Sequence, residues 1–406
     1  MTPETKTAPT GWRQGLTRNV IILGFVSLLN DGASEMIYPL LPVFLTAVLG
    51  AGPAALGIIE GIAESTASLL KLYSGYLSDR VKRRKGWILA GYLISNVIRP
   101  LIAFSTSWVH VLALRFSDRV GKGLRTSPRD AIIADSTPVE YRGLAYGFHR
   151  AMDHGGAIVG PLIATALLLV YHDNLRTIFL LSFIPGLLAV ILLLLGLREK
   201  APVEPRTAAS AGFNFRAAWA EMPSGFRKYL VIILIFALGN STDAFLLLRA
   251  QQLGVPISLL PTIWVVLHIV KMGFSVPGGI LSDRIGRKKV IVAGWVVYAL
   301  VYAAFGVASA NWHAWALFMI YGIYFGLTEG VEKALVADFA PAHLRGSAFG
   351  LYHLIVGLGA LPASLLFGLV WQKLGAAAAF GMGAGLAMLA SVMLSLLEVK
   401  GPAEVK

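Results

Sequence analysis

Charged side chains are concentrated on one face of residues 107–134, a stretch long enough to cross a membrane as a helix. They are Arg115, Asp118, Arg119, Lys122, Arg125, Arg129 and Asp130. At 100° per residue these positions occupy a single arc of roughly 140°. Because a guanidinium group binds a carboxylate or a phosphate through two parallel hydrogen bonds, this face is suited to an anionic ligand.

Placing these charges against lipid would cost roughly 2.5–3.5 kcal/mol for each ionised side chain, even on a mild insertion scale. Asp118 and Lys122 are four residues apart and can pair along the helix. Arg125 and Arg129 have the same spacing but repel each other, and five basic residues against two acidic ones leave a positive surplus. We therefore interpret this face as the lining of a water-filled cavity, with a buried ion-pair ladder as the alternative.

Acidic and histidine side chains recur in other apolar stretches, often four residues apart, as Asp31 and Glu35 are. A carboxylate in a partly dehydrated cavity favours its protonated form and can carry a proton from one side to the other. For proton coupling we expect Glu35, Glu64, Asp153, His149 and Glu329. For substrate binding we expect Arg115, Arg119, Lys122, Arg125, Asp31, Asp243 and Arg249. For any one acidic residue, a structural ion pair is an equally good interpretation.

The elements that must position these groups are membrane-spanning helices. Of the 406 residues, 56% are hydrophobic and only 14% are charged, against about 25% charged in soluble proteins. Apolar runs near 20 residues long, such as 178–197, suit a helix that crosses about 30 Å of hydrocarbon. We predict twelve spans: 19–47, 54–78, 87–105, 107–134, 144–171, 174–197, 229–252, 258–281, 289–309, 312–336, 346–371 and 375–397. There is no cysteine, which excludes disulfides and thiolate metal sites.

The basic residues between spans set the expected orientation. Connections on one side carry Arg and Lys clusters such as 80–85 and 284–289, whereas those on the other side carry almost none. The positive-inside rule places the basic side and both termini in the cytoplasm. We expect a cytoplasmic tail (1–18), an N-terminal six-helix bundle (19–197), a cytoplasmic linker (198–228), a C-terminal six-helix bundle (229–397) and a second tail (398–406).

The two halves of the chain repeat. The segment Gly-Tyr-Leu-Ser-Asp-Arg that begins at Gly75 returns 204 residues later as Gly-Ile-Leu-Ser-Asp-Arg at Gly279. A second pattern, which begins at Asp135 and continues with Pro138 and Arg142, returns 203 residues later from Asp338. Two separate patterns with nearly equal offsets indicate an internal duplication.

Both loops resemble the G-x-L-x-D-R-x-G-R-K loop of the major facilitator superfamily of secondary transporters. The copy at Gly279 matches throughout, whereas the copy at Gly75 has Lys82 in place of the second glycine. Gly156, Gly160 and Pro161 resemble the antiporter motif of the same family, although Ala164 and Thr165 replace its closing glycines. The resemblance implies an all-α membrane fold of two six-helix bundles, twelve transmembrane helices in all, related by a pseudo-two-fold axis.

In such a fold the loops would form a cytoplasmic gate. Glycines would allow close helix packing, and aspartates would face helix N-termini. Arg83 and Arg287 would reach Asp135 and Asp338, respectively. The gating set is Gly75, Asp79, Arg80, Arg83, Asp135, Gly279, Asp283, Arg284, Arg287 and Asp338. The alternative is that these residues fix only topology and loop shape. His110, His313 and His353 are expected to be packing or interface residues.

We therefore predict a secondary active transporter that works by alternating access, coupled to protons, for a small solute with a carboxylate or phosphate, which can be zwitterionic. Export is favoured by the motif at Gly156. The alternatives are a multidrug/proton antiporter for lipophilic cations and a non-transporting membrane receptor, which would be expected to add a soluble domain.

An enzyme is not expected, because catalytic motifs are not found. We expect no cofactor, no metal and no nucleic acid partner. The predicted location is a bacterial cytoplasmic (inner) membrane, with the lipid bilayer, the substrate and the proton as partners. The protein is expected to be a monomer, as family members usually are.

Overall fold

The computed structural model describes residues 14–41, 44–51, 53–81, 83–171, 174–199, 219–241, 243–256 and 259–398. These residues form helices joined by short turns, without a strand in the described ranges. Most of the tails 1–18 and 398–406, most of the linker 198–228, and Lys82 lie outside them. The expected domain boundaries therefore stay predictions.

The N-terminal half holds α1 (Arg18–Glu35), η2 (Tyr38–Leu40), η3 (Phe44–Val48), α3 (Pro53–Val81), α4 (Lys85–Ile98), η4 (Arg99–Phe104), α5 (Trp108–Asp135), η5 (Val139–Tyr141), α6 (Arg142–Val170), α7 (Leu175–Leu181) and α8 (Phe183–Gly196). The C-terminal half holds α10 (Ser224–Gly239), α11 (Ala244–Gln252), α12 (Leu260–Ile285), α13 (Arg287–Val307), α14 (Asn311–Phe339), η7 (Ala342–Leu344), α15 (Arg345–Leu374) and α16 (Ala376–Leu396). In the part of the chain that the structure describes, the longer helices, with the pieces that continue them, form twelve segments close to the predicted spans.

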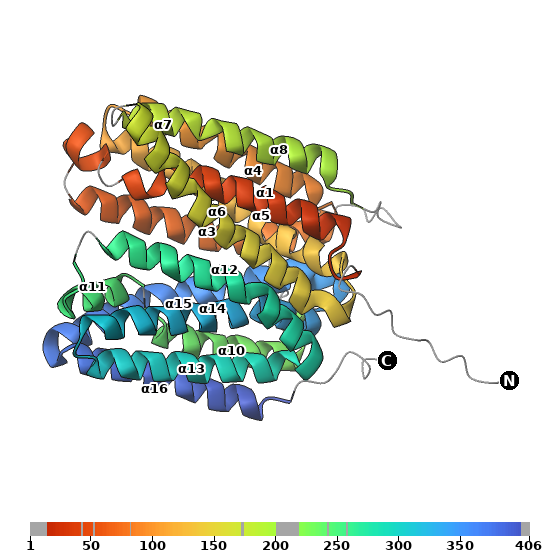
Figure 1. Cartoon of the computed structure of the whole chain (residues 1–406). Helices are drawn as coiled ribbons and strands as arrows, with labels where there is room; N and C mark the ends of the chain where they lie inside the picture. Colours follow the sequence, from red (N-terminus) through yellow and green to blue (C-terminus); the bar gives the residue numbers. More distant parts are fainter. Residues whose placement is uncertain are drawn as a thin grey trace.

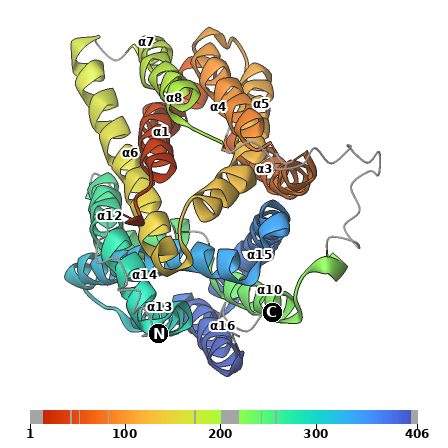
Figure 2. The ribbon, with the colours of Figure 1, turned by 90° about the vertical axis from the view of Figure 1, so that its right-hand side faces the viewer.

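The two halves lie side by side as separate helical bundles (Figure 1). Viewed along the helices, α1 and α3–α8 form one group and α10–α16 the other (Figure 2). Within the described residues, nine segments are long and apolar enough to cross a membrane. The charged α5 is not among them. The arrangement confirms the predicted all-α membrane fold.

Breaks in the helices follow from local sequence. Pro100 stands at the start of η4, where the missing backbone N–H ends the regular α-helical bonding of α4. Gly286 separates α12 from α13 with φ of 100°, a conformation that is costly for residues with a side chain. The loop between these two helices therefore turns sharply at the position where the signature has its second glycine.

The two bundles are in contact at the end that carries residues 83–85 and 285–287, which we call the signature-loop end. The pairs α6–α12 and α3–α15 pack against each other there across the bundle interface. A Cβ atom at Gly279 would overlap the carbonyl oxygen of Gly143, and one at Gly75 would overlap that of Gly346. The close approach of these backbones requires glycine, and it closes the signature-loop end.

Replacing Gly279 with alanine is predicted to loosen this closed end. Overpacking at such a contact costs about 1–3 kcal/mol, which corresponds to a change of at least about fivefold in a conformational equilibrium. The reporter is Ser347→Cys, because this side chain is 1% exposed and its hydroxyl has no hydrogen-bond partner among the described residues. We expect Gly279→Ala to raise the rate of maleimide labelling at this reporter about tenfold.

Gly273→Ala is the matched control, since it lies on the same helix and a Cβ atom there meets nothing within 4 Å. Equal labelling of the two alanine variants would contradict the steric explanation.

Candidate transport pathway and gate

The signature-loop end is closed by two equivalent sets of hydrogen bonds between the bundles. The carboxylate of Asp79 accepts bonds from the backbone N–H groups of Gly346 and Ser347, at 2.9 and 2.6 Å. On the other side, Asp283 accepts from Gly143 and Leu144, at 3.0 and 2.8 Å. Each carboxylate thus lies at the N-terminus of a helix of the opposite bundle, where the helix dipole favours negative charge.

Arginine side chains surround both carboxylates. The Arg84 guanidinium donates to Asp79 at 2.7 Å and to Asp135. In the second set, Arg287 pairs with Asp283 and contacts Asp338 at 3.2 Å. Across the interface, Arg142 bonds Asp338 at 2.7 Å and Arg345 bonds Asp135.

The structure corrects one gating assignment. Arg83 is exposed, and Arg84 takes the position expected for it. The repeat offset is 204 at Asp79 but 203 at Asp135, so the N-terminal copy has one extra residue between them. That change of offset was a sequence signal for Arg84. Arg284 is exposed as well, and the guanidinium of Arg80 lies 4.6 Å from the ring centre of Tyr76 on its own helix.

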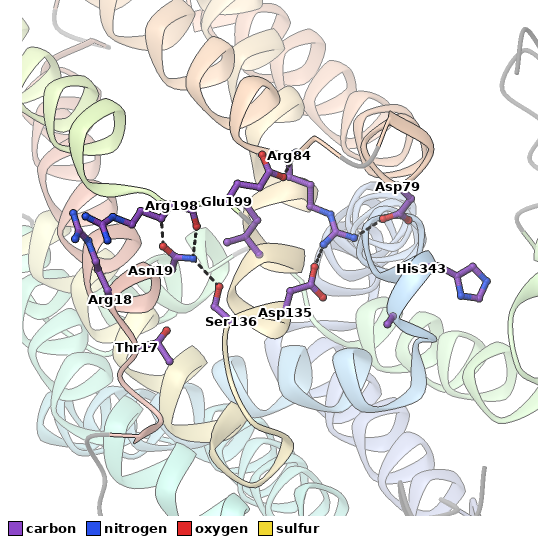
Figure 3. A pocket seen from close by; sticks show the side chains of 12 residues that line it. Thr17, Arg18, Asn19, Asp79, Arg84, Asp135, Ser136, Arg198, Glu199 and His343 are labelled. Carbon is purple, nitrogen blue, oxygen red and sulfur yellow. Dashed lines mark hydrogen bonds and ion pairs between the residues drawn. The ribbon is translucent and has the colours of Figure 1, made fainter. Parts of the chain in front are cut away.

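A cavity of about 740 Å³ lies at this end, beside the Arg84 cluster (Figure 3). Asn19 and Ser136 form part of its wall and are hydrogen-bonded to each other at 3.0 Å. Glu199, at the start of the expected linker, accepts bonds from the backbone N–H groups of Arg84 and Lys85, at 2.5 and 3.1 Å. The segment after α8 is therefore attached directly to the gate loop.

The charged face of α5 divides into two groups. Asp118 is 1% exposed and pairs with Arg99 of η4 at 2.8 Å. Arg125 is 4% exposed and donates to Ser95 of α4 at 2.6 Å. Arg115, at 3% exposed, lies 3.5 Å from Asp118. These side chains are held inside the N-terminal bundle, so the expectation that the whole face lines a cavity is too broad.

Arg119 and Lys122 are the half-buried members of the α5 face. Both lie within electrostatic reach of Glu35 on α1, as does Asp31 on the same helix. Four of the expected residues of α1 and α5 therefore lie in one electrostatic neighbourhood of the N-terminal bundle. The backbone of Glu64 is helical, but its side chain lies outside the described part of the chain.

In the C-terminal bundle, aromatic rings surround a buried cation. Lys271 of α12 is 4% exposed, and its ammonium group lies 3.8 Å from the ring centre of Phe325. Trp264 is also close, at 5.8 Å. Asp243 lies 3.8 Å from this ammonium and accepts a bond from the Tyr321 hydroxyl at 2.6 Å.

Arg249 is not part of this group. It donates to the carbonyl oxygens of Phe305 and Ala308, at 3.0 and 2.8 Å, and so caps the end of α13. Its placement does not support a role in substrate binding.

Ionisable side chains bridge the bundles between α6 and α14. Arg150 lies 2.8 Å from Asp153 on its own helix and 3.2 Å from Glu329 of α14. His154 lies 3.2 Å from Glu329 and, through Nδ1, 3.2 Å from Nδ1 of His268 on α12. Three expected proton-coupling residues, Glu329, Asp153 and the neighbouring His149, therefore lie in one network.

Gly156 and Gly160 lie against α1, where their missing side chains allow the backbone of α6 to approach Leu28 and Gly32. Pro161 follows inside the same helix. This motif therefore packs two helices of one bundle together.

A further buried cluster was not predicted as a site from the sequence. Asp130 is fully buried and bonds Lys333 of α14 at 2.6 Å and His353 of α15 at 3.0 Å. The positions of Asp130 and Lys333 are 203 residues apart, the same offset as in the second repeat pattern. This offset was the available sequence signal.

Comparison with known proteins decides the family. A sequence model of the Major Facilitator Superfamily matches residues 23–274 and 229–406. The chain belongs to the major facilitator superfamily. An uncharacterized transporter of this type from Methanocaldococcus jannaschii is 35% identical, over 93% of this chain and 94% of the relative.

Other relatives carry functional names. The multidrug resistance protein MdtG of Proteus mirabilis is 27% identical, over 91% of this chain and 92% of its own. The cis,cis-muconate transport protein of Acinetobacter baylyi is 21% identical, over 86% of each chain. These names describe the relatives, and together with the family they show an integral membrane transporter of a non-enzyme family.

Solved structures agree on the fold. The human organic anion transporter MFSD10 superposes with a TM-score of 0.77 at 19% identity, over 95% of this chain and all of that one. The transporter FucP in its outward conformation gives a TM-score of 0.77 at 13% identity, over 94% of this chain and 99% of that one.

Arg84→Ala is predicted to weaken the closed gate of this transporter. The substitution releases Asp79 and Asp135, and a hydrogen bond to a charged group contributes about 1.5–3 kcal/mol. We expect maleimide labelling of the Ser347→Cys reporter to rise at least tenfold. Arg83→Ala removes the same charge one residue away from an exposed position and is expected to leave labelling unchanged. Faster labelling with Arg83→Ala and unchanged labelling with Arg84→Ala would show that Arg83, as first expected, holds the closed end.

Proposed function

We propose that this protein is a proton-coupled transporter that exports a small organic anion by alternating access. The substrate class is a solute with a carboxylate or phosphate group, which can be zwitterionic. In this proposal the protein acts as a monomer in a bacterial cytoplasmic membrane, and the signature-loop end faces the cytoplasm. The closed signature-loop end then corresponds to an outward-facing state.

The proposed substrate class is supported mainly by the cationic side chains, which lie on both bundles. Arg119 and Lys122 are half-buried on the N-terminal side, and Lys271 lies among aromatic rings on the C-terminal side. An anion between the bundles would contact positive charge from both. Phe325 and Trp264 beside Lys271 favour an organic anion with a planar or apolar body.

Proton coupling is supported by the network between α6 and α14. Glu329 contacts Arg150 and His154 of the opposite bundle, so its surroundings change whenever the bundles move relative to each other. A carboxylate that has cationic partners in one conformation and lacks them in the other has a different proton affinity in the two states. That difference is the requirement for coupling.

Export of lipophilic cations is the second candidate. The relative named as a multidrug resistance protein favours it, and Asp31, Glu35 and Asp243 provide negative charge near the centre. The relative named as a muconate transport protein favours the anion. The half-buried Arg119 and Lys122, with Lys271 on the other bundle, make the anion our first choice.

Removal of the α5 cations is predicted to abolish anion binding. We would measure the melting temperature of detergent-purified protein with cis,cis-muconate, other carboxylates and phosphates, and tetraphenylphosphonium as the cation probe. An anion at about 100 times its Kd should raise the melting temperature by about 5 °C. Arg119→Ala and Lys122→Ala should lose this shift, and Arg83→Ala, which removes an exposed charge, should keep it. Stabilisation by tetraphenylphosphonium alone would overturn the anion proposal.

We predict that Glu329→Gln keeps the exchange of substrate across the membrane but loses its coupling to protons. In liposomes, the variant should exchange labelled for unlabelled cis,cis-muconate but should lose accumulation driven by a pH gradient, because the side chain can no longer bind and release a proton. Glu332→Gln is the control three residues away, where the carboxylate accepts bonds from Trp295 and Tyr352 within its own bundle. Uphill transport by Glu329→Gln at the parent rate would contradict this role.

A further inference from the structure

Three basic side chains gather around the end of α8, where the chain leaves its membrane-spanning part. The guanidinium of Arg18 donates through Nε to the carbonyl oxygen of Gly196, the last residue of the helix, at 3.2 Å. The ammonium group of Lys85 donates to the carbonyl oxygen of Leu197 at 2.7 Å. Arg198 is the next residue of the chain. We call Arg18, Lys85 and Arg198 the basic cluster.

Hydrogen bonds hold the two arginines of the cluster in one place. The side chain of Asn19 accepts a bond from the backbone N–H of Arg198 at 3.1 Å and donates to its carbonyl oxygen at 2.8 Å. Because Asn19 follows Arg18 directly, these bonds join the start of α1 to the segment after α8. Both arginine side chains are exposed and extend to the same side, away from Asp79 and His343 (Figure 3).

The positive charge of the basic cluster exceeds the negative charge beside it. Within the described residues, none of its three members forms an ion pair with a carboxylate, and the guanidinium of Arg198 donates no hydrogen bond. The acidic neighbour in the chain is Glu199, which accepts bonds from the backbone N–H groups at the start of α4. Three cations and one carboxylate leave a surplus of two positive charges.

Exposed apolar side chains lead away from the cluster along both helices. Ile21 and Phe25 lie three and seven residues after Arg18, so they share its face of α1, and they are 37% and 46% exposed. On α8, Leu194 and Leu195 are 51% and 73% exposed. The two helices pack against each other, and both are long and apolar enough to cross a membrane. In the bilayer these side chains meet acyl chains, and the basic cluster lies at the level of the headgroups.

We propose that the basic cluster binds the phosphate of an anionic phospholipid, whose acyl chains lie along the exposed faces of α1 and α8. Guanidinium groups bind phosphate through parallel hydrogen bonds, and basic sites between membrane helices suit anionic headgroups. A zwitterionic lipid fits less well, because its own positive group would meet the surplus of positive charge. The proposal needs only the membrane location of these helices, so it is independent of the substrate and of proton coupling.

The site belongs to a single bundle. Arg18, Lys85 and Arg198 all lie in the N-terminal bundle, so their arrangement is kept when the two bundles move relative to each other as rigid bodies. The bound lipid therefore stabilises the fold of this bundle and does not favour one conformation of the gate.

The test compares three probes on the detergent-purified full chain. They are dioleoylphosphatidylglycerol, dioleoylphosphatidylcholine at the same mole fraction, and sn-glycerol 3-phosphate as a soluble phosphate. Near saturation, phosphatidylglycerol should raise the melting temperature by about 3 °C and remain bound in native mass spectra. The other two probes should do neither. An equal effect of sn-glycerol 3-phosphate would indicate a site for free phosphate, and an equal effect of phosphatidylcholine would indicate general lipid binding; each would overturn the proposal.

Arg18→Gln combined with Arg198→Gln should weaken binding of phosphatidylglycerol at least about tenfold, because charge-assisted hydrogen bonds are lost. Arg83→Gln combined with Arg284→Gln is the matched control, since it removes two exposed cations at the same end of the molecule. The control should keep the parental response. Equal responses of the two double variants would overturn the proposal. Lipid retained in native mass spectra gives a second measurement that does not depend on the melting temperature.

Maleimide labelling of Ser347→Cys tests the assignment to one bundle. The rate should be the same with and without phosphatidylglycerol, because the lipid contacts one bundle only. A change in rate that the Arg18→Gln and Arg198→Gln double variant abolishes would overturn this assignment.

Discussion

An ionised side chain within the membrane must meet water or a partner of opposite charge, and this constraint organises the protein. In the N-terminal bundle, Asp118 pairs with Arg99 at 2.8 Å, both nearly inaccessible to solvent. At the interface, Asp130 pairs with Lys333 of the other bundle at 2.6 Å. Pairs within a bundle stabilise that bundle, whereas pairs between the bundles stabilise one conformation of the transporter.

The duplication of the chain explains why the contacts between the bundles form two equivalent sets. Asp79 accepts bonds from the start of α15, and Asp283 accepts equivalent bonds from the start of α6. Each aspartate needs a glycine four residues earlier on its helix, at Gly75 and Gly279, so that the two backbones can touch. A closed gate of this kind relies on backbone N–H groups and helix dipoles, which vary little with the side chains around them.

Charged groups recur along the contact between the two bundles. Asp130 pairs with Lys333, and Glu329 contacts Arg150 and His154, in both cases across the bundles. A transporter that alternates between two states needs interactions that are strong in one state and absent in the other. Ion pairs that cross between rigid bundles meet this need, because a small rotation separates the charges completely.

The sequence by itself determined the class of fold, the repeat and the two signature-loop aspartates, Asp79 and Asp283. Apolar length and helical periodicity are local properties, and the family motif lies in a short loop, so each could be recognised without a structure. The same periodicity predicted that the seven charges of α5 share one side of the helix. Periodicity shows which residues share a face, but it does not show which neighbour covers that face.

Only the tertiary structure determined which partner each charged side chain has. It turned Arg125 towards Ser95 inside the bundle, left Lys122 half-buried, and placed Arg84 at the gate in place of Arg83. Asp130 meets Lys333 only because two helices 203 residues apart in the chain pack together. A buried charge is stabilised by whatever lies within a few ångströms of it, and that neighbour is set by the packing of helices distant in sequence.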